Sequence, residues 1–245
     1  MSTEAPAAPG HAHGDHPAIL GHHFDDIEQQ RSAMRLGMWL FLVTELLFFG
    51  GVFVAYTAYR IWYPEAWAAA SSKLNPLIAG INSFLLLTSS LTVTIAIYRA
   101  KAGNNAGLKS MLMATWVLGV TFLAFKGIEY RNDYVEGLVP GSMFNHEMFA
   151  EGVDTKKVQL FFVFYYCMTG IHVIHLIIGV GLVAWIWMEA RRNEITKERY
   201  TKVEVISLYW HFVDLIWLFI VPCLYLAGTH STEQLQLWVE AHHHG

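Results

Sequence analysis

The feature that most constrains this sequence is a series of five long stretches that contain almost no charged residue. They cover residues 36–59, 74–98, 110–130, 158–188 and 205–229. Each stretch is long enough to cross a hydrocarbon core, which needs roughly 20 helical residues. A segment inside a bilayer must satisfy its own backbone hydrogen bonds, and the period-two alternation of barrel strands is absent. The sequence therefore predicts an all-α membrane protein, a bundle of five transmembrane helices.

Composition agrees with this class and excludes others. Only 15% of the residues are charged, against about 25% in soluble domains. The formal net charge of −4 gives no reason to expect a nucleic-acid partner. The two cysteines, Cys167 and Cys223, both lie in apolar stretches, and they provide neither a disulfide framework nor a thiolate metal site.

The polar ends of the chain set the expected domain boundaries and orientation. Residues 1–30 form a His-rich polar segment that we expect to be a disordered tail, residues 31–230 form the five-helix domain, and residues 231–245 form a second tail. Ten Lys and Arg residues fall on the side of the N-terminus and five on the other side. By the positive-inside rule, the N-terminus is expected in the cytoplasm and the C-terminus outside. Trp62, Tyr63 and Trp67 are expected to form an aromatic belt at one interface.

Seven Asp, Glu, His and Lys residues lie within the expected spans, and Glu204 is grouped with them because it lies on the same helical stripe as His211. The full set is Glu45, Lys126, Glu129, His172, His175, Glu204, His211 and Asp214. Ionisable groups in a bilayer are costly unless they face the bundle interior and find partners. These residues therefore either hold the helices together or form a proton path, a metal or haem site, or a lipid headgroup site.

Spacing predicts which of these side chains act together. Lys126 and Glu129 are three residues apart, as are His211 and Asp214, so each pair shares a helix face. We expect His211 and Asp214 to hydrogen-bond across to the fourth span, which carries His172.

Glu45 is the candidate for a functional role. It lies nine residues into the first span, about 14 Å along a helix, close to the midplane. No lysine or arginine lies at its depth, so we expect Glu45 to be protonated and to find a histidine partner.

The residues do not assemble a recognisable catalytic or redox site. A b-type haem requires two facing histidines, and only three histidines lie within the spans, two of them on one helix. The sequence contains no Gly-rich phosphate loop, no His-Glu-x-x-His zinc motif and no Gly-x-Ser-x-Gly elbow. We therefore assign no catalytic and no metal-ligating residue to this chain.

Four segments nevertheless carry a specific resemblance. The segment YWHFVDLIWLF at residues 209–219 strongly resembles the last transmembrane helix of subunit III of haem-copper terminal oxidases. MWLFLVTELLFF at residues 38–49, GIEY at 127–130 and TGIHVIHLIIG at 169–179 resemble further segments of that family, in the same order. Many family members have seven helices, the first two forming one arm of a lipid-holding cleft, whereas five are expected here.

The resemblance implies an accessory subunit without redox centres of its own. Haem and copper then belong to the protein partners, which are the catalytic subunit I and subunit II. Membrane lipids are the other expected partners. Subunit III is held to stabilise the catalytic core and to support proton uptake, and a bound phospholipid is the one small molecule that the resemblance adds. The expected location is the bacterial inner membrane. A quinol oxidase subunit III, a nitric-oxide-reductase accessory subunit and, from another class, a membrane b-type cytochrome remain alternatives.

Overall fold

The computed structural model describes residues 26–149, 152–196 and 200–226. This part of the chain is helical and contains no strand. Its elements are α1 (Ile27–Trp62), α2 (Pro64–Ser71), α3 (Pro76–Ala102), α4 (Asn105–Val135), the short 3-10 helix η1 (His146–Met148), α5 (Thr155–Arg191) and α6 (Thr201–Tyr225). Five of them, α1, α3, α4, α5 and α6, are long and apolar enough to cross a membrane. The prediction of an all-α membrane protein with five transmembrane helices is confirmed.

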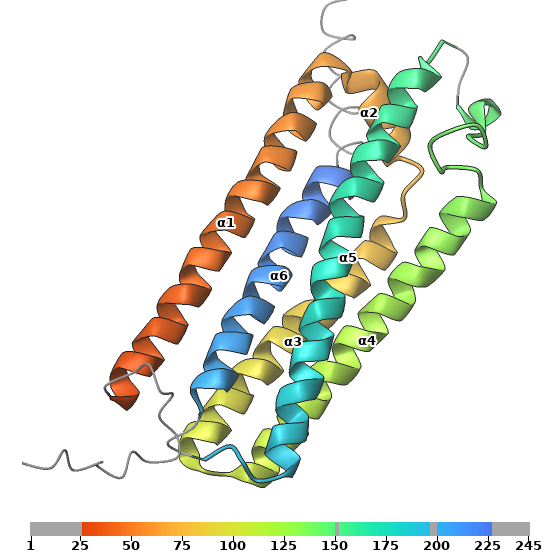
Figure 1. Cartoon of the computed structure of the whole chain (residues 1–245). Coiled ribbons are helices and arrows are strands. Elements are labelled where there is room, and N and C mark those ends of the chain that lie inside the picture. Colours follow the sequence, from red (N-terminus) through yellow and green to blue (C-terminus); the bar gives the residue numbers. More distant parts are fainter. Residues whose placement is uncertain (1–25, 150–151, 197–199, 227–245) are drawn as a thin grey trace, which may run out of the picture.

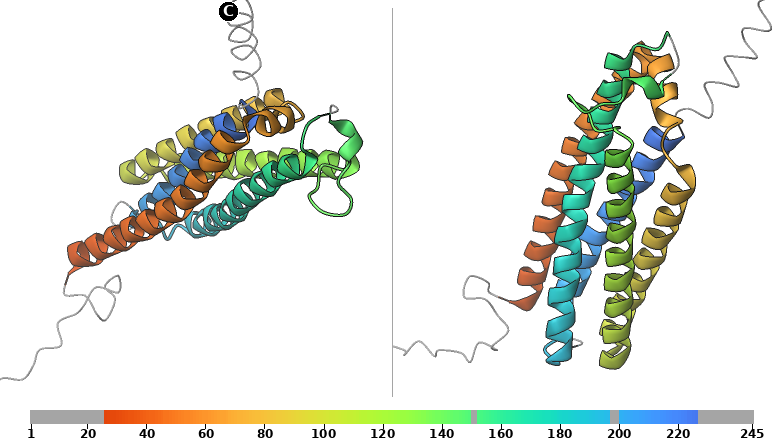
Figure 2. Two further views of the ribbon diagram at one scale, coloured as in Figure 1. Left: turned by 90° about the horizontal axis from the view of Figure 1, so that it is seen from above. Right: turned by 90° about the vertical axis from the view of Figure 1, so that its right-hand side faces the viewer.

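The five long helices form an elongated bundle with α6 at its centre. Figures 1 and 2 show α1 along one side of α6, with α3 and α5 on its other sides and α4 beyond them. Within the most apolar 18-residue window, 56% of α6 is buried but only 11% of α1. Most of α1 is therefore left to face lipid or a neighbouring chain.

Side-chain caps determine where several helices begin. Asp26 accepts a hydrogen bond from the amide of Gln29, and Asn75 accepts from the amides of Leu77 and Ile78 ahead of α3. Such caps satisfy backbone donors that have no partner within the helix. At the end of α3, Gly103 takes a left-handed conformation with a φ of 72°, which glycine adopts without steric cost.

The helices extend beyond the apolar stretches from which they were expected. α1 begins at Ile27, so residues 27–30 of the expected tail are helical, and α4 continues to Val135 rather than ending at residue 130. The reason is that an apolar stretch marks the thickness of the hydrocarbon core, whereas the backbone remains helical until a cap or turn ends it. Residues 1–25 and 227–245, which include most of the two expected tails, lie outside the described residues.

Buried positions follow a three-then-four spacing along the helices. In α3 they are Ala79, Asn82, Leu86, Ser89, Val93, Ala96 and Ala100. α4 has the same pattern, with Leu108, Leu112, Thr115, Gly119, Phe122, Lys126, Glu129 and Asp133. This spacing is that of left-handed helix pairs. Many of these residues are small or polar because, in lipid, close approach and interhelical hydrogen bonds replace the hydrophobic effect between helices.

The segment after α1 differs from the expected aromatic belt. Trp62 is exposed, but Trp67 lies on the short helix α2 and is 1% exposed. Its ring packs edge-on against Phe161 of α5, with 5.8 Å between the ring centroids. Trp67 therefore belongs to the protein core, because the turn at Tyr63 and Pro64 folds α2 back over the bundle.

Candidate functional site

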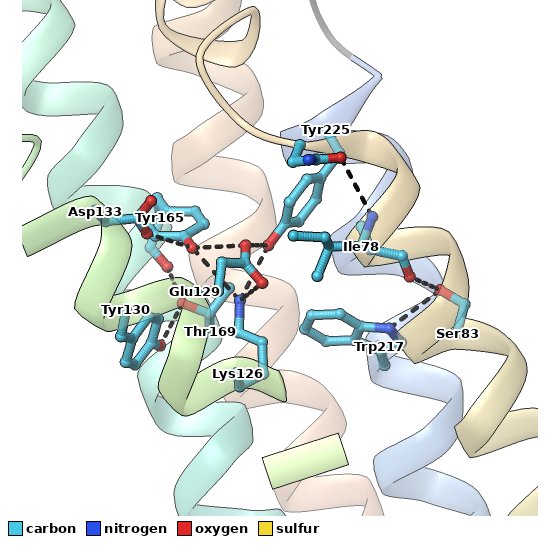
Figure 3. A network of polar contacts seen from close by, with 12 residues as sticks. Ile78, Ser83, Lys126, Glu129, Tyr130, Asp133, Tyr165, Thr169, Trp217 and Tyr225 are labelled. Atoms are coloured by element: carbon cyan, nitrogen blue, oxygen red, sulfur yellow. Dashed lines mark hydrogen bonds and ion pairs between the residues drawn. The ribbon is translucent and has the colours of Figure 1, made fainter. Parts of the chain in front are cut away.

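A buried charged network joins the C-terminal parts of α4 and α6 to the N-terminal part of α5, at the end of the bundle where α2 lies (Figures 1 and 3). Lys126 of α4 is 1% exposed, and its Nζ atom lies 3.2 Å from Oε2 of Glu129. The same ammonium group donates to the hydroxyl of Tyr225 of α6 at 3.0 Å and, at 3.4 Å, to that of Tyr165 of α5. The expected Lys126–Glu129 pair is thus present, and it links three helices rather than one helix face.

Aromatic rings enclose the ammonium group of Lys126. Nζ lies 5.1–5.7 Å from the ring centroids of Tyr130, Tyr165, Trp217 and Tyr225. A cation at this distance is attracted by a ring, most strongly where water is excluded. The rings therefore help to offset the cost of burying Lys126, as does its ion pair with Glu129.

The network has members that the sequence reasoning missed. The hydroxyl oxygen of Tyr165 lies 3.0 Å from Oδ2 of Asp133 and 3.0 Å from Oε1 of Glu129. The hydroxyl groups of Tyr130 and Thr169 are hydrogen-bonded at 2.7 Å. Asp133 follows Glu129 by four residues, which places both on one helix face. That spacing could have identified Asp133, if the third span had been extended past residue 130.

A second polar contact joins α1 to α5 near the middle of both helices. Oε2 of Glu45 lies 3.0 Å from Nε2 of His175, and the two side chains are 21% and 15% exposed. Glu45 therefore has the kind of partner expected from the sequence. Phe49 packs edge-on against the same imidazole, with 5.3 Å between the ring centroids.

Hydrogen positions in this pair follow from its neighbours. Nδ1 of His175 lies 2.9 Å from the carbonyl oxygen of Ile171. A carbonyl only accepts, so Nδ1 carries a hydrogen, and one further proton lies between Nε2 and Glu45. The pair has no net charge, whether it is an acid beside an imidazole or a carboxylate beside an imidazolium. That the proton belongs to Glu45 stays a prediction.

The prediction for His211 is wrong in its partner helix. Its Nδ1 atom lies 2.6 Å from the hydroxyl of Ser90 and its Nε2 atom 3.3 Å from that of Thr94, and both belong to α3, not to α5. α3 and α6 run antiparallel and pack along their length, so this side of α6 faces α3. No spacing within α6 contains that information.

Asp214 is buried beside Ser90 but makes no interhelical hydrogen bond to α5. Both of its carboxyl oxygens are buried, and the polar group that acts on them is the hydroxyl of Ser90 of α3, which also contacts Nδ1 of His211. The expected bond from Asp214 to the fourth span is therefore absent from the described residues.

The remaining sequence candidates occupy separate places. His172 is fully buried against Phe122 and Trp217, with ring centroids 5.8 Å and 5.0 Å away. Glu204 lies at the opposite end of the bundle from the Lys126 network. There it pairs with Arg35 of α1 at 3.0 Å and with Lys101 of α3 at 2.7 Å. Glu204 therefore ties α1, α3 and α6 together.

The contacts of His175 and His211 join neighbouring helices. Within the described residues, no three His, Cys, Asp or Glu side chains converge as metal ligands. Both ring nitrogens of His175 and of His211 already have partners. Ligation of a haem by either histidine would have to break one of these contacts, whereas the present contacts join α1 to α5 and α3 to α6.

Comparison with known proteins identifies a family that matches most of the chain. A family model described as cytochrome c oxidase subunit III matches residues 15–229. The chain is 32% identical over 219 residues to a cytochrome c oxidase subunit 3 from Synechocystis, which covers 89% of this chain and 81% of the relative. It is 31% identical over 214 residues to a cytochrome c oxidase subunit 3 from Rhizopus stolonifer, covering 85% of this chain and 68% of the relative. It is also 25% identical over 194 residues to a protein from Staphylococcus haemolyticus named "Probable quinol oxidase subunit 3", covering 79% of this chain and 89% of the relative.

Proposed function

This chain belongs to the cytochrome c oxidase subunit III family, and from this premise we propose that it is a non-catalytic subunit that stabilises the catalytic subunit and supports proton uptake. It is an integral membrane protein with the accessory role of a haem-copper oxidase subunit III. Its location is the inner membrane of a bacterium, with the N-terminus in the cytoplasm.

The partners of the chain are subunits I and II of the oxidase, and these subunits hold the haem and copper. Two histidines that lie within the helices, His175 and His211, use both ring nitrogens in contacts that join helices. This supports electron transfer in the partners rather than here. Cytochrome c is the proposed electron donor of the complex.

The observation that carries the proposed role is the Glu45–His175 pair. It is a polar contact near the middle of α1 and α5 that stays partly open, with side chains 21% and 15% exposed, and α1 is a helix that the bundle covers little. A partly open, net-neutral carboxyl–imidazole pair can bond to a polar group of a neighbouring subunit or to a phospholipid headgroup. The role of Glu45 is to support the partner's proton uptake, not to carry electrons.

Replacement of Glu45 in the assembled complex tests this role. We expect Glu45→Ala to leave the haem spectrum unchanged, while proton uptake slows and activity is lost sooner during turnover. Glu45→Gln keeps a hydrogen-bond donor for Nε2 of His175 and should have a smaller effect. Glu65→Gln, at an exposed acid of α2, is the matched control and should behave as the unmodified complex. Proton uptake and turnover lifetime that are normal in Glu45→Ala would refute the role.

Chemical labelling gives a second test. A hydrophobic carbodiimide reacts with protonated carboxyls that it can reach from the bilayer. We expect it to label Glu45 in preference to Glu129, which is 5% exposed, and to Glu65, which is exposed on α2 outside the five long helices. Labelling of Glu65 rather than Glu45 would contradict the predicted state and position of Glu45.

Co-purification tests the partners. We expect the tagged chain to bring down a haem-containing catalytic subunit and a copper-binding subunit II. Oxidation of quinol instead of cytochrome c by that complex would assign the chain to the quinol branch, as the name of the Staphylococcus relative suggests. A haem spectrum that follows the purified chain alone would overturn the proposal in favour of a b-type cytochrome.

A further inference from the structure

The hydrogen bonds of the Lys126 network require one more proton than its phenols and its lysine provide. The oxygen of Tyr165 has three polar neighbours: Nζ of Lys126 at 3.4 Å, Oε1 of Glu129 at 3.0 Å and Oδ2 of Asp133 at 3.0 Å (Figure 3). The contact with Lys126 uses a hydrogen of the ammonium group. The two contacts with carboxyl oxygens need one proton each, but a phenol has only one.

Tyr225 cannot supply the missing proton. Its oxygen accepts from Nζ of Lys126 at 3.0 Å, and its own proton is directed to Oε1 of Glu129. Lys126 directs its hydrogens towards the two phenols and Glu129. If both carboxyls were ionised, one pair of oxygens 3.0 Å apart would face each other without a proton between them.

The charge balance indicates the same deficit. One ammonium group and two carboxylates would leave a net charge of −1 on three residues of which none is more than 7% exposed. An uncompensated buried charge is far more costly than a neutral group that is fully hydrogen-bonded. A carboxylic acid in place of one carboxylate removes both problems.

We propose that Asp133 binds a proton in the folded chain and that Lys126, Glu129 and Asp133 form a net-neutral proton-binding site. Oδ2–H of Asp133 donates to the oxygen of Tyr165, and Tyr165 donates to Glu129. Glu129 remains the carboxylate because it pairs directly with Lys126 at 3.2 Å and already accepts from Tyr225.

The position of Asp133 makes this proton exchangeable. Asp133 lies two residues before the end of α4 and is 7% exposed, whereas Lys126, seven residues deeper, is 1% exposed. The other titratable groups that face Asp133 are Tyr130 of α4, Glu136 just after α4 and Tyr166 of α5. The ligand of this site is therefore a proton that the aqueous phase at this end of the bundle can supply or remove.

Infrared spectroscopy of the full chain in its complex tests the site directly. Aspartate labelled with ¹³C at the carboxyl separates aspartic from glutamic acid bands, and Asp214→Asn in the background removes the other aspartate that is buried among the described residues. We expect a protonated-aspartate band that shifts with the label and in D₂O. This band should be lost in Asp133→Asn and retained in Glu136→Gln. Absence of any protonated-aspartate band in the labelled background protein, or the same band in Asp133→Asn, would overturn the proposal.

Thermal unfolding provides a test that does not rest on band assignment. An asparagine at 133 donates to Tyr165 as the acid does, so Asp133→Asn should leave the unfolding midpoint unchanged. Glu129→Gln removes the counterion of Lys126 and should lower it. If Asp133 were ionised in the unmodified protein, asparagine would remove the uncompensated negative charge and supply the missing hydrogen, so Asp133→Asn would raise the unfolding midpoint instead of leaving it unchanged.

Discussion

At the scale of single residues, buried polar groups act in this protein as members of sets. Lys126, with Glu129 and the phenols around it, joins α4 to α5 and α6, while Glu45 joins α1 to α5 through His175. A buried ion pair adds little stability over an apolar pair of the same shape, but removing one partner leaves the other unpaired. The loss of one member therefore costs more than the pair itself contributes.

Replacement of the buried lysine tests this non-additivity. Lys126→Met leaves Glu129 without a counterion, and we expect it to destabilise the folded chain by about 3–5 kcal/mol. The double variant Lys126→Met with Glu129→Gln should recover part of that loss. The yield of assembled complex and the unfolding midpoint are the measurements, with Lys156→Met, at an exposed lysine of α5, as the control. A double variant whose loss of stability equals the sum of the losses in Lys126→Met and Glu129→Gln would contradict this account.

Asp154 provides a residue-scale prediction about pH. Its carboxylate accepts from the amide of Lys156 at 3.1 Å and pairs with Lys157 at 3.2 Å, and the bond with Lys157 lowers the pKa of Asp154. A carboxyl whose pKa is lower in the folded state stabilises at pH values above its unfolded pKa, and this contribution is lost as pH falls through the folded pKa.

We therefore expect the first turn of α5 to lose hydrogen-exchange protection as the medium is acidified into the range where Asp154 binds a proton. Asp154→Asn keeps a capping oxygen that does not titrate and should remove this pH dependence. Asp154→Ala should leave the turn weakly protected at every pH. An acid-induced loss that persists in Asp154→Asn would assign the effect to another group.

At the scale of helices, close approach depends on where small residues meet large ones. A Cβ atom added at Gly119 of α4 would lie 2.7 Å from Cη2 of Trp210 and 3.1 Å from Cγ2 of Val180. Trp210 has little freedom to move, because it is fully buried and its indole N–H donates to Ser89 at 3.0 Å. Gly119 therefore allows α4 to pack against the ring at the centre of the bundle.

Two glycines of the same helix form a matched pair for testing this contact. Gly119→Ala should destabilise the chain by about 1–3 kcal/mol through overpacking. Gly127→Ala meets no atom within 4 Å and should be neutral, or stabilising by up to about 1 kcal/mol through helix propensity. Chemical unfolding in detergent measures both variants. Equal stability of the two would mean that α4 and Trp210 separate without cost.

At the scale of the whole molecule, the fold gathers basic side chains at one end. The ends of α1, α3, α4, α5 and α6 that meet there carry Arg31, Arg35, Arg99, Lys101, Lys109, Arg191, Arg192 and Lys202 (Figure 1). Basic residues in short connections are retained on the cytoplasmic side. This arrangement supports the proposed orientation with the N-terminus inside.

Labelling from one side of the membrane tests the orientation. In cells treated with a membrane-impermeant maleimide, we expect a cysteine replacing Lys156 to be labelled and a cysteine replacing Lys109 to react only after the membrane is opened. The unmodified chain, whose Cys167 and Cys223 lie within α5 and α6, serves as the background. The reverse pattern would place the N-terminus outside.

The sequence alone determined the number and approximate position of the membrane helices and the residues that carry the family resemblance. These follow from quantities that are linear along a chain: apolar length set against bilayer thickness, and the cost of each charge within it. It also identified Lys126 and Glu129 as a pair and Glu45 as needing a histidine, because few partners were available.

Only the tertiary structure decided which helix faces meet. It brought His211 to Ser90 rather than to α5, placed Trp67 in the core, and added Asp133 and Tyr165 to the network around Lys126. Nearly every side of these helices is apolar, so hydrophobic periodicity does not distinguish the face that packs from the face that meets lipid. That choice depends on the fit of small, polar and aromatic side chains from several helices at once, which no single segment contains.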